Sequence, residues 1–405
     1  MFYFFLFISI QDQDNILFLF LKGISILQDD KTFLDNNATS AVAKEVANAI
    51  LEELTMPPSN PSSTHHFGQQ AKSRLLQART SIARYLGVKP TEIIFTSGGT
   101  ESMNWLIEGT CASHKMGHII TSNVEHSCVE KSLHKMERLG WDVSFLEAGL
   151  YGAVLPSQIE AALKETTRLI VLGGANSETG VKHDIDLISA IAKREKIDFI
   201  IDAVALFGKE PLLLPKGVTG AGFSAHKFHG PKGAGFAYIK SPYHIDPMMR
   251  GGSQEFSLRA GTENLPGIIG IAKAIDLLSE QLPMASERMQ ALRDLFESDL
   301  ARIASPILIN GEGVRVCNTS NLAFPGVDGE TLLIQLDLHG IQASHGSACS
   351  SGSLEPSRIL MNMGYSKDRA KSSLRFSLSR FTTNEEITKA ATIIAKIVSQ
   401  LRAFS

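Results

Sequence analysis

Short β-rich runs alternate with longer amphipathic helical patterns along most of this chain of 405 residues, and this alternation constrains its fold more than any other feature. The β-rich runs lie at 93–95, 118–121, 143–146, 168–172, 198–201 and 235–239. The helical patterns between them lie at 69–86, 101–113, 129–139, 157–165 and 186–195. Helices of this length between strands form right-handed crossovers, which make the strands parallel and bury the sheet. We therefore expect an α/β protein with a mostly parallel sheet.

The pattern changes after Pro266. A long amphipathic helical region at 268–303 comes first, and we expect Pro283 to interrupt it because proline lacks an N–H group. The remaining pattern predicts strands at 320–323 and 341–343 and helices at 330–336 and 384–401. These elements indicate a second, smaller α+β domain.

The expected organisation thus has three parts. Residues 1–30 form an N-terminal extension without an assigned role, 31–265 form the large domain, and 266–405 form the small C-terminal domain. The segment near 31–45 can pack with the small domain. Polar residues 11–15 divide the apolar start of the chain into two runs, each too short to cross a membrane. We therefore expect no membrane association.

The charge and the cysteine content exclude other classes of protein. A net charge of −3 provides no basic excess of the kind that nucleic-acid-binding proteins carry, so we expect no direct nucleic-acid partner. The four cysteines contain no CxxC pair and no dense framework, a usage that fits a reducing, cytoplasmic compartment, and we expect no metal site. They are Cys111, Cys128, Cys317 and Cys349.

The stretch VTGAGFSAHKFHGPKGAGF (218–236) contains the lysine best suited to chemistry. An apolar run precedes Lys227 and a Gly/Pro cluster follows it, so we expect a junction between strand and loop. In open α/β sheets, ligands bind beyond the carboxyl ends of the strands. A lysine partly removed from water is less stable as an ammonium ion, which frees its amine for Schiff-base chemistry. The alternative is a solvated loop lysine.

A glycine-rich turn, TSGGTESMN (96–104), follows the first predicted strand. Gly99 allows the backbone to approach a ligand, and a helix starting near Thr100 offers free N–H groups to an anion such as phosphate. The same residues also make a good ordinary helix start. Beside Lys227, Ser224 and His226 add a hydroxyl and an imidazole that can hold a phosphate.

Two more side chains follow predicted strands. His126 can stack on a flat ring or pass protons, or it can be a histidine at a helix start that bonds to the backbone. Asp202 closes an apolar run, and a buried carboxylate needs a partner such as a protonated ring nitrogen or an arginine. Together with Lys227 and a phosphate site, these are the requirements of pyridoxal phosphate.

The predicted small domain supplies two further candidates. Cys349 lies in SHGSACSSGSLEPS, a segment of small and polar residues that indicates an exposed, reactive cysteine, although an incidental loop thiol has the same pattern. Arg375 can form a bidentate pair with a substrate carboxylate. Arg380 is a rival for that role, and either arginine can instead be an exposed strand residue.

These residues resemble the NifS/IscS-like cysteine desulfurases, fold type I pyridoxal-phosphate enzymes of the class-V aminotransferase family. The resemblance covers about 33–401 and none of residues 1–30. It rests on LDNNAT (34–39), FTSGGTES (95–102), NVEHSCV (123–129), SAHKFHGPKG (224–233), GGSQEFSLRAGTEN (251–264), GSACSSGSLEPS (346–357) and LRFSLSRFTTNEEI (374–387).

The resemblance implies a seven-stranded, mostly parallel sheet and a role for each candidate. Lys227, His126 and Cys349 would be catalytic, with Lys227 as the Schiff-base lysine and Cys349 as the nucleophile. Arg375 and Asn37 would bind the substrate. The implied cofactor-binding residues are Gly99, Thr100, His126, Asn176, Ser177, Asp202, Ser224, His226, Lys227 and, from the other subunit of a homodimer, Thr262.

The implied activity converts L-cysteine to alanine, with a persulfide on Cys349 that passes to an acceptor such as an iron–sulfur scaffold or a tRNA-thiolation protein. One alternative is a relative acting on selenocysteine or a related amino acid. Another is a catalytically weakened sulfur-transfer or assembly partner. The latter is suggested by Ser177 and Ala205, which replace the family's asparagine and glutamine next to the phenolic oxygen of the cofactor.

Overall fold

The computed structural model describes residues 31–242, 245–346 and 356–403, and within them the largest sheet has seven strands, in the order β2-β8-β7-β6-β5-β3-β4. Strand β8 is antiparallel to both of its neighbours, and the other pairs are parallel. This confirms the expected mostly parallel sheet. The strands are β2 (Ile93–Thr96), β3 (His118–Ser122), β4 (Asp142–Leu146), β5 (Thr167–Gly173), β6 (Asp198–Asp202), β7 (Gly220–Ser224) and β8 (Gly235–Ile239).

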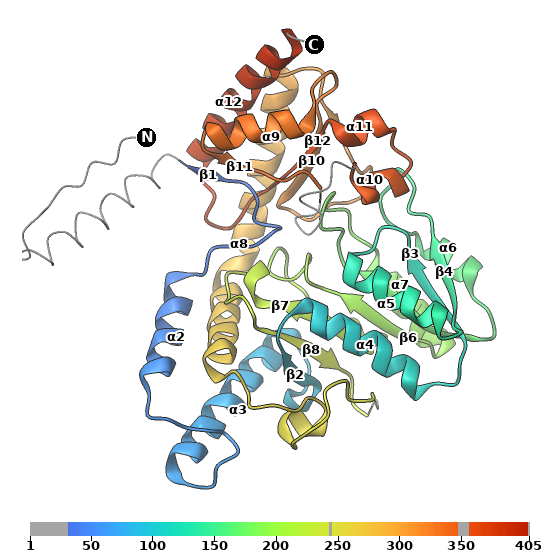
Figure 1. Cartoon of the computed structure of the whole chain (residues 1–405), viewed down its shortest axis with the longest axis vertical. Helices are drawn as coiled ribbons and strands as arrows, with labels where there is room; N and C mark the ends of the chain where they lie inside the picture. The colour runs from blue at the N-terminus through green and yellow to red at the C-terminus, as the bar shows by residue number, and fades with distance from the viewer. Residues whose placement is uncertain (1–30, 243–244, 347–355, 404–405) are drawn as a thin grey trace, which may run out of the picture.

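Both faces of this sheet are covered by helices (Figure 1). Alternate residues of one strand belong to two different cores: Phe199 and Ile201 pack in one, and Ile200 packs in the other. The side chains of a strand alternate between faces, so a sheet buried on both faces requires continuous apolar runs. The covering helices are α3 (His66–Leu86), α4 (Gly99–Ser113), α5 (Ser127–Arg138), α6 (Pro156–Ala162) and α7 (Ile185–Glu195).

A three-stranded antiparallel sheet, in the order β12-β10-β9, forms the centre of the C-terminal part. Its core includes Leu34 near the start of the described chain, and strand β1 pairs with β11 in parallel. The division near residue 266 stays a proposal. The elements are β1 (Thr32–Phe33), β9 (Leu308–Ile309), β10 (Thr319–Ala323), β11 (Ile341–Gln342), β12 (Ser373–Ser377), α9 (Gly329–Leu338) and α12 (Asn384–Ala403).

Helix α8 (Leu265–Ile303) continues through Pro283, so the expected interruption there is wrong. Leu282 packs in the core of the large sheet, and Leu292 packs in the core of the smaller sheet. Burial of one helix in two cores offsets the hydrogen bond that the proline cannot make. Among the described residues, no helix is long and apolar enough to cross a membrane.

Three of the described helices had no sequence prediction: α2 (Lys44–Thr55), α10 (Arg358–Asn362) and α11 (Lys367–Lys371). Helix α10 begins two residues after the undescribed stretch 347–355. The carboxyl ends of β6 and β7 lead into Asp202 and into the short 3-10 turn η2 (Ala225–Lys227). This edge of the sheet faces the C-terminal part. In parallel sheets, ligands bind at the edge formed by the carboxyl ends of the strands.

Candidate active site

A cavity of about 1140 Å³ lies at the carboxyl edge of the large sheet. Thr262 is exposed and does not line this cavity. Cys349 lies outside the described residues. The other predicted site residues all line the cavity, and they are Asn37, Gly99, Thr100, His126, Asn176, Ser177, Asp202, Ser224, His226, Lys227 and Arg375.

Lys227 ends the turn η2 that follows strand β7, and its side chain is half-buried. Its Nζ donates hydrogen bonds to the backbone oxygens of Asn37, at 2.5 Å, and Ala38, at 2.9 Å. The buried Lys209 donates in turn to the backbone oxygen of Lys227 at 2.8 Å. The main chain and the amine of Lys227 are therefore both held in place.

Asp202 is a buried carboxylate at the end of strand β6. Burial raises its pKa, while His126, the Val204 N–H and Lys227 act in the opposite direction. Its Oδ1 accepts a hydrogen bond from the backbone N–H of Val204 at 3.0 Å. Among the described residues no arginine forms an ion pair with Asp202, and this buried acid lines the cavity beside His126 and Lys227. A protonated pyridine nitrogen fits this position.

His126 is the N-cap of helix α5. Its Nδ1 accepts a hydrogen bond from the backbone N–H of Cys128 at 3.2 Å and lies 3.0 Å from Cys128 Sγ. Because Nδ1 acts as an acceptor, the neutral ring carries its proton on Nε2. The backbone contact proposed as an alternative is thus present, and the ring also lines the cavity.

The phosphate candidates gather at the start of helix α4. A Cβ at Gly99 would lie 2.5 Å from Val204 Cγ2, so glycine allows the close approach of the two segments here. The first N–H groups of a helix have no intrahelical partners and attract anions. His226 lies nearby with Nδ1 3.1 Å from Thr39 Oγ1, and burial and Lys227 lower its pKa to about 4. A neutral imidazole, a hydroxyl at Ser224 and these N–H groups suit a phosphate.

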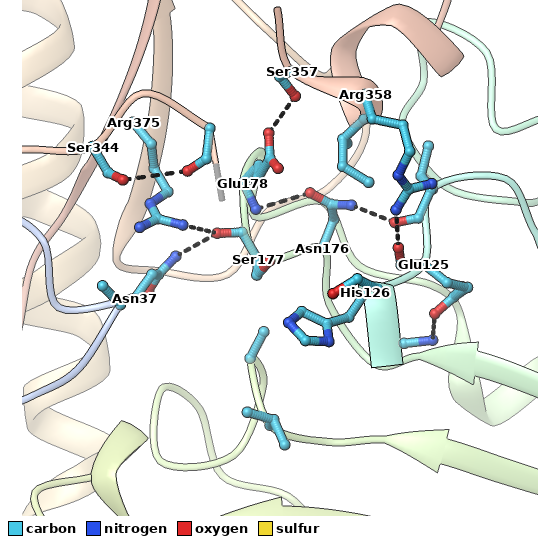
Figure 2. A pocket seen from close by; sticks show the side chains of 18 of the residues that line it. Asn37, Glu125, His126, Asn176, Ser177, Glu178, Ser344, Ser357, Arg358 and Arg375 are labelled. Atoms are coloured by element: carbon cyan, nitrogen blue, oxygen red, sulfur yellow. Dashed lines mark hydrogen bonds between the residues drawn. The ribbon is translucent and has the colours of Figure 1, made fainter. Parts of the chain in front are cut away.

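Arg375 is 2% exposed on strand β12, so its interpretation as an exposed strand residue is wrong. Its Nη2 pairs with Asp35 Oδ1 at 2.6 Å, and its Nη1 donates to the backbone oxygen of Ser177 at 3.1 Å. Figure 2 shows Asn37 donating to that same oxygen. The Nε of Arg375 is buried without a described partner. Arg380 does not line the cavity.

The side-chain amides of Asn37 and Asn176 are occupied by the protein itself. Asn37 Nδ2 donates to Thr319 Oγ1 at 2.8 Å as well as to Ser177, and its Oδ1 accepts from Asn318. Asn176 Nδ2 donates to the Val124 oxygen at 2.9 Å. Both side chains therefore shape the wall of the cavity.

Sequence reasoning missed three buried charged residues that line the cavity. Burial and the nearby Asp202 raise the pKa of Glu125 to about 8, against hydrogen bonds from Ser122 and Gly173. Burial lowers the pKa of Lys209 to about 8. Glu178, whose pKa burial also raises, accepts a hydrogen bond from Ser357 at 2.5 Å (Figure 2). Two of them had a sequence signal, since Glu125 directly precedes His126 and Glu178 directly follows Ser177.

The profile of the aminotransferase class-V family matches residues 32–389. "Cysteine desulfurase IscS" from Dictyoglomus turgidum is 42% identical over 379 residues, which cover 93% of this chain and 96% of the relative. "Cysteine desulfurase IscS" from Methanosarcina thermophila is 39% identical over 388 residues, with coverages of 95% and 96%.

Solved structures are similar as well. A NifS-like protein superposes with a TM-score of 0.85 at 33% identity, over 91% of this chain and all of that one. A NifS-like protein from Rickettsia africae superposes with a TM-score of 0.82 at 30% identity, over 91% and 99% of the two chains. Together with a cavity suited to pyridoxal phosphate, these matches lead to one assignment: the chain belongs to the aminotransferase class-V family, within its NifS/IscS-like group of pyridoxal-phosphate enzymes.

Proposed function

We propose that the protein is a pyridoxal-phosphate-dependent L-cysteine desulfurase that releases alanine and retains the sulfur as a persulfide on Cys349. The observation that carries this proposal is the presence, in one cavity, of a lysine amine, a buried acid and a buried arginine. These are Lys227, Asp202 and Arg375. The names of the relatives support the choice of cysteine as substrate.

The residues of the cavity would hold the cofactor at both of its ends. Asp202 would pair with the ring nitrogen, and His126 would stack on the ring. Thr100, Ser224 and the helix start at Gly99 would bind the phosphate. When bound, pyridoxal phosphate supplies an aldehyde that captures the substrate amine and a ring that stabilises the electron pair left by the α-proton.

Lys227 would move the α-proton through its Nζ. That atom is held by the backbone oxygens of Asn37 and Ala38, so it has a defined position in the cavity. The substrate carboxylate would bind Arg375, whose orientation is fixed by Asp35 and by the Ser177 oxygen. His126 presents an Nε2–H group that can donate to the substrate or the cofactor.

The sulfur-transfer step joins the thiolate of Cys349 to the substrate sulfur, and it would depend on the electron-accepting ring that the bound cofactor supplies. Cys349 attacks that sulfur, so an S–S bond forms while the C–S bond of the substrate breaks. The electron pair of the broken bond stays on carbon and takes up a proton. Cysteine and the thiol of Cys349 thus become alanine and a persulfide, without any external oxidant.

We further propose a cytoplasmic homodimer in which Thr262 reaches the phosphate of the neighbouring subunit. Thr262 is exposed and does not line the cavity of its own subunit, which supports this placement. The sulfur would pass to an acceptor protein, such as an iron–sulfur scaffold or a tRNA-thiolation protein.

A second candidate is a weakened sulfur-transfer or assembly partner. Ala205 lines the cavity without any side-chain donor, and Ser177 lines it with a side chain shorter than the family's asparagine. Losing a hydrogen bond to the cofactor costs about 1–3 kcal/mol, or roughly ten- to a hundredfold in rate.

Alanine release by the purified full chain, loaded with pyridoxal phosphate, distinguishes the candidates. The desulfurase releases alanine from cysteine over many turnovers when a reductant is present, and Lys227→Ala does not. Bound cofactor without turnover at saturating cysteine supports the assembly partner. Faster turnover with selenocysteine than with cysteine would change the assigned substrate.

A further inference from the structure

Three potential metal ligands of different chemistry meet in the cavity. They are a ring nitrogen of His126, the Sγ of Cys128 and a carboxylate oxygen of Asp202, and they all lie within 4.8 Å of one another. Within residues 31–242, 245–346 and 356–403, no other group of three or more such side chains comes this close together. Figure 2 shows the ring of His126 at the start of the helix that carries Cys128.

The fold explains why these three residues meet. His126 and Cys128 belong to the first turn of helix α5, which follows strand β3, whereas Asp202 ends strand β6. Both strands present their carboxyl ends at the same edge of the sheet. The residues therefore converge only in the folded protein and form no spacing motif in the sequence. For this reason the sequence led us to expect no metal site.

The spacing is close to that of a tetrahedral zinc ion. Zinc lies about 2.0–2.3 Å from nitrogen, oxygen and sulfur ligands, so its ligands are separated by about 3.3–3.8 Å. The three ligand atoms lie at most 4.8 Å apart, so the longest separation would have to shorten by no more than about 1–1.5 Å. The 3.0 Å contact between His126 Nδ1 and Cys128 Sγ would have to open slightly, and a metal bound at Nδ1 would replace the hydrogen bond from the Cys128 N–H.

The charges around the site favour a divalent cation. Asp202 places a carboxylate oxygen within 4.8 Å of the other two ligand atoms, and a carboxylate attracts a divalent cation.

We propose that the cofactor-free protein binds Zn²⁺, or a similar divalent metal that accepts thiolate, through His126, Cys128 and Asp202, with water as the fourth ligand. Binding displaces the thiol proton to solvent and forms the metal–sulfur bond. His126 and Asp202 are also the residues assigned to the cofactor ring. The metal and pyridoxal phosphate therefore exclude each other, and metal capture controls how readily the cofactor loads.

The first test uses Co²⁺ as a spectroscopic probe on the full chain stripped of cofactor. One equivalent produces a thiolate-to-cobalt charge-transfer band in the near ultraviolet, and Cys128→Ala abolishes this band. The affinity of Cys128→Ala for Co²⁺ falls by more than the roughly 10–100-fold that follows from removing a residue that only contacts a metal ligand. The control variants Cys111→Ala and Cys349→Ala keep the band. A band that survives Cys128→Ala, or that disappears with Cys349→Ala, overturns the proposal.

The second test needs no variant and so does not depend on how Cys128→Ala folds. Zn²⁺ added in equimolar amount to the cofactor-free protein blocks the visible absorbance that appears when pyridoxal phosphate binds. A chelator restores that absorbance, and protein already loaded with cofactor binds no Co²⁺. Equal binding of Co²⁺ to the loaded and the cofactor-free protein overturns the proposal. Because neither test measures turnover, both remain informative even if the protein releases no alanine.

Discussion

Arg375 and Asp35 form an ion pair of 2.6 Å in which the arginine side chain is only 2% exposed. Asp35 follows strand β1, while Arg375 lies on strand β12, 340 residues later. The pair therefore joins the start of the described chain to the smaller sheet at the wall of the cavity. It leaves Arg375 oriented by one carboxylate before any substrate carboxylate arrives.

Replacing Asp35 by asparagine tests this orientation. Asp35→Asn keeps the shape of the side chain but removes the charge that fixes Arg375, so we expect KM for cysteine to rise about tenfold with a smaller change in kcat. Steady-state kinetics of alanine release provide the measurement. Glu297→Gln breaks a similarly buried pair with Arg315 outside the cavity, and it should leave KM unchanged. An equal KM in Asp35→Asn and the parent would contradict the assignment.

Replacing Glu125 by glutamine should change how stability depends on pH. The folded pKa of Glu125, about 8, lies above its ordinary value of 4.5, so this group makes the protein progressively less stable as pH rises from 4.5 to 8. Each unit of pKa is worth about 1.4 kcal/mol, so Glu125→Gln should gain up to about 4 kcal/mol at pH 8 and almost nothing at pH 4.5.

Urea unfolding of the cofactor-free protein at both pH values measures this difference. Glutamine can still accept from the Gly173 N–H and bond to Ser122, so the contacts of the glutamate are retained. A gain of the same size at both pH values would show that folding does not raise the pKa of Glu125.

Much of the fold follows from the sequence, because continuous apolar runs and helical periodicity depend on local residues. The run at 235–239 coincides with strand β8, and the other predicted strands of the large sheet differ from the observed ones by one or two residues at their ends. Continuation of helix α8 through Pro283 was missed because it depends on packing against two cores.

The candidate site was only partly predictable, because part of it also depends on contacts between residues that are distant in the sequence. Lys227 and Asp202 follow recognisable strands, so their positions could be inferred. The burial of Arg375 depends on its pairing with Asp35, and the pKa of Glu125 depends on burial beside Asp202. Neither contact leaves a local pattern in the sequence, because the partners are brought together only by the folded sheet.

Replacing Asp202 by asparagine should weaken the cofactor without unfolding the protein. A neutral amide no longer favours a protonated ring nitrogen, so we expect the affinity for pyridoxal phosphate to fall at least tenfold, equivalent to about 1.4 kcal/mol. Fluorescence titration of the cofactor-free protein measures this affinity. Asp198→Asn is a matched control at the opposite end of strand β6, where the aspartate pairs with His114. If both variants bind the cofactor equally well, Asp202 has a different role.

Adding a methyl group at Gly99 should disturb the start of helix α4. The new Cβ would meet Val204 Cγ2 at 2.5 Å, and valine is too stiff to move aside without shifting the backbone. We expect Gly99→Ala to weaken cofactor binding about tenfold through its phosphate. The double variant Gly99→Ala/Val204→Ala should recover most of the affinity, because the obstructing methyl group is gone. Failure of this rescue would point away from steric crowding.

Mass spectrometry of the Cys349 peptide after reaction with L-cysteine, without any reductant, tests the central claim most directly. The account predicts one extra sulfur atom on Cys349 and one alanine released per active site, with neither product in Cys349→Ala. Alanine release by Cys349→Ala at the parent rate, or sulfur retained on Cys128 instead, would contradict it.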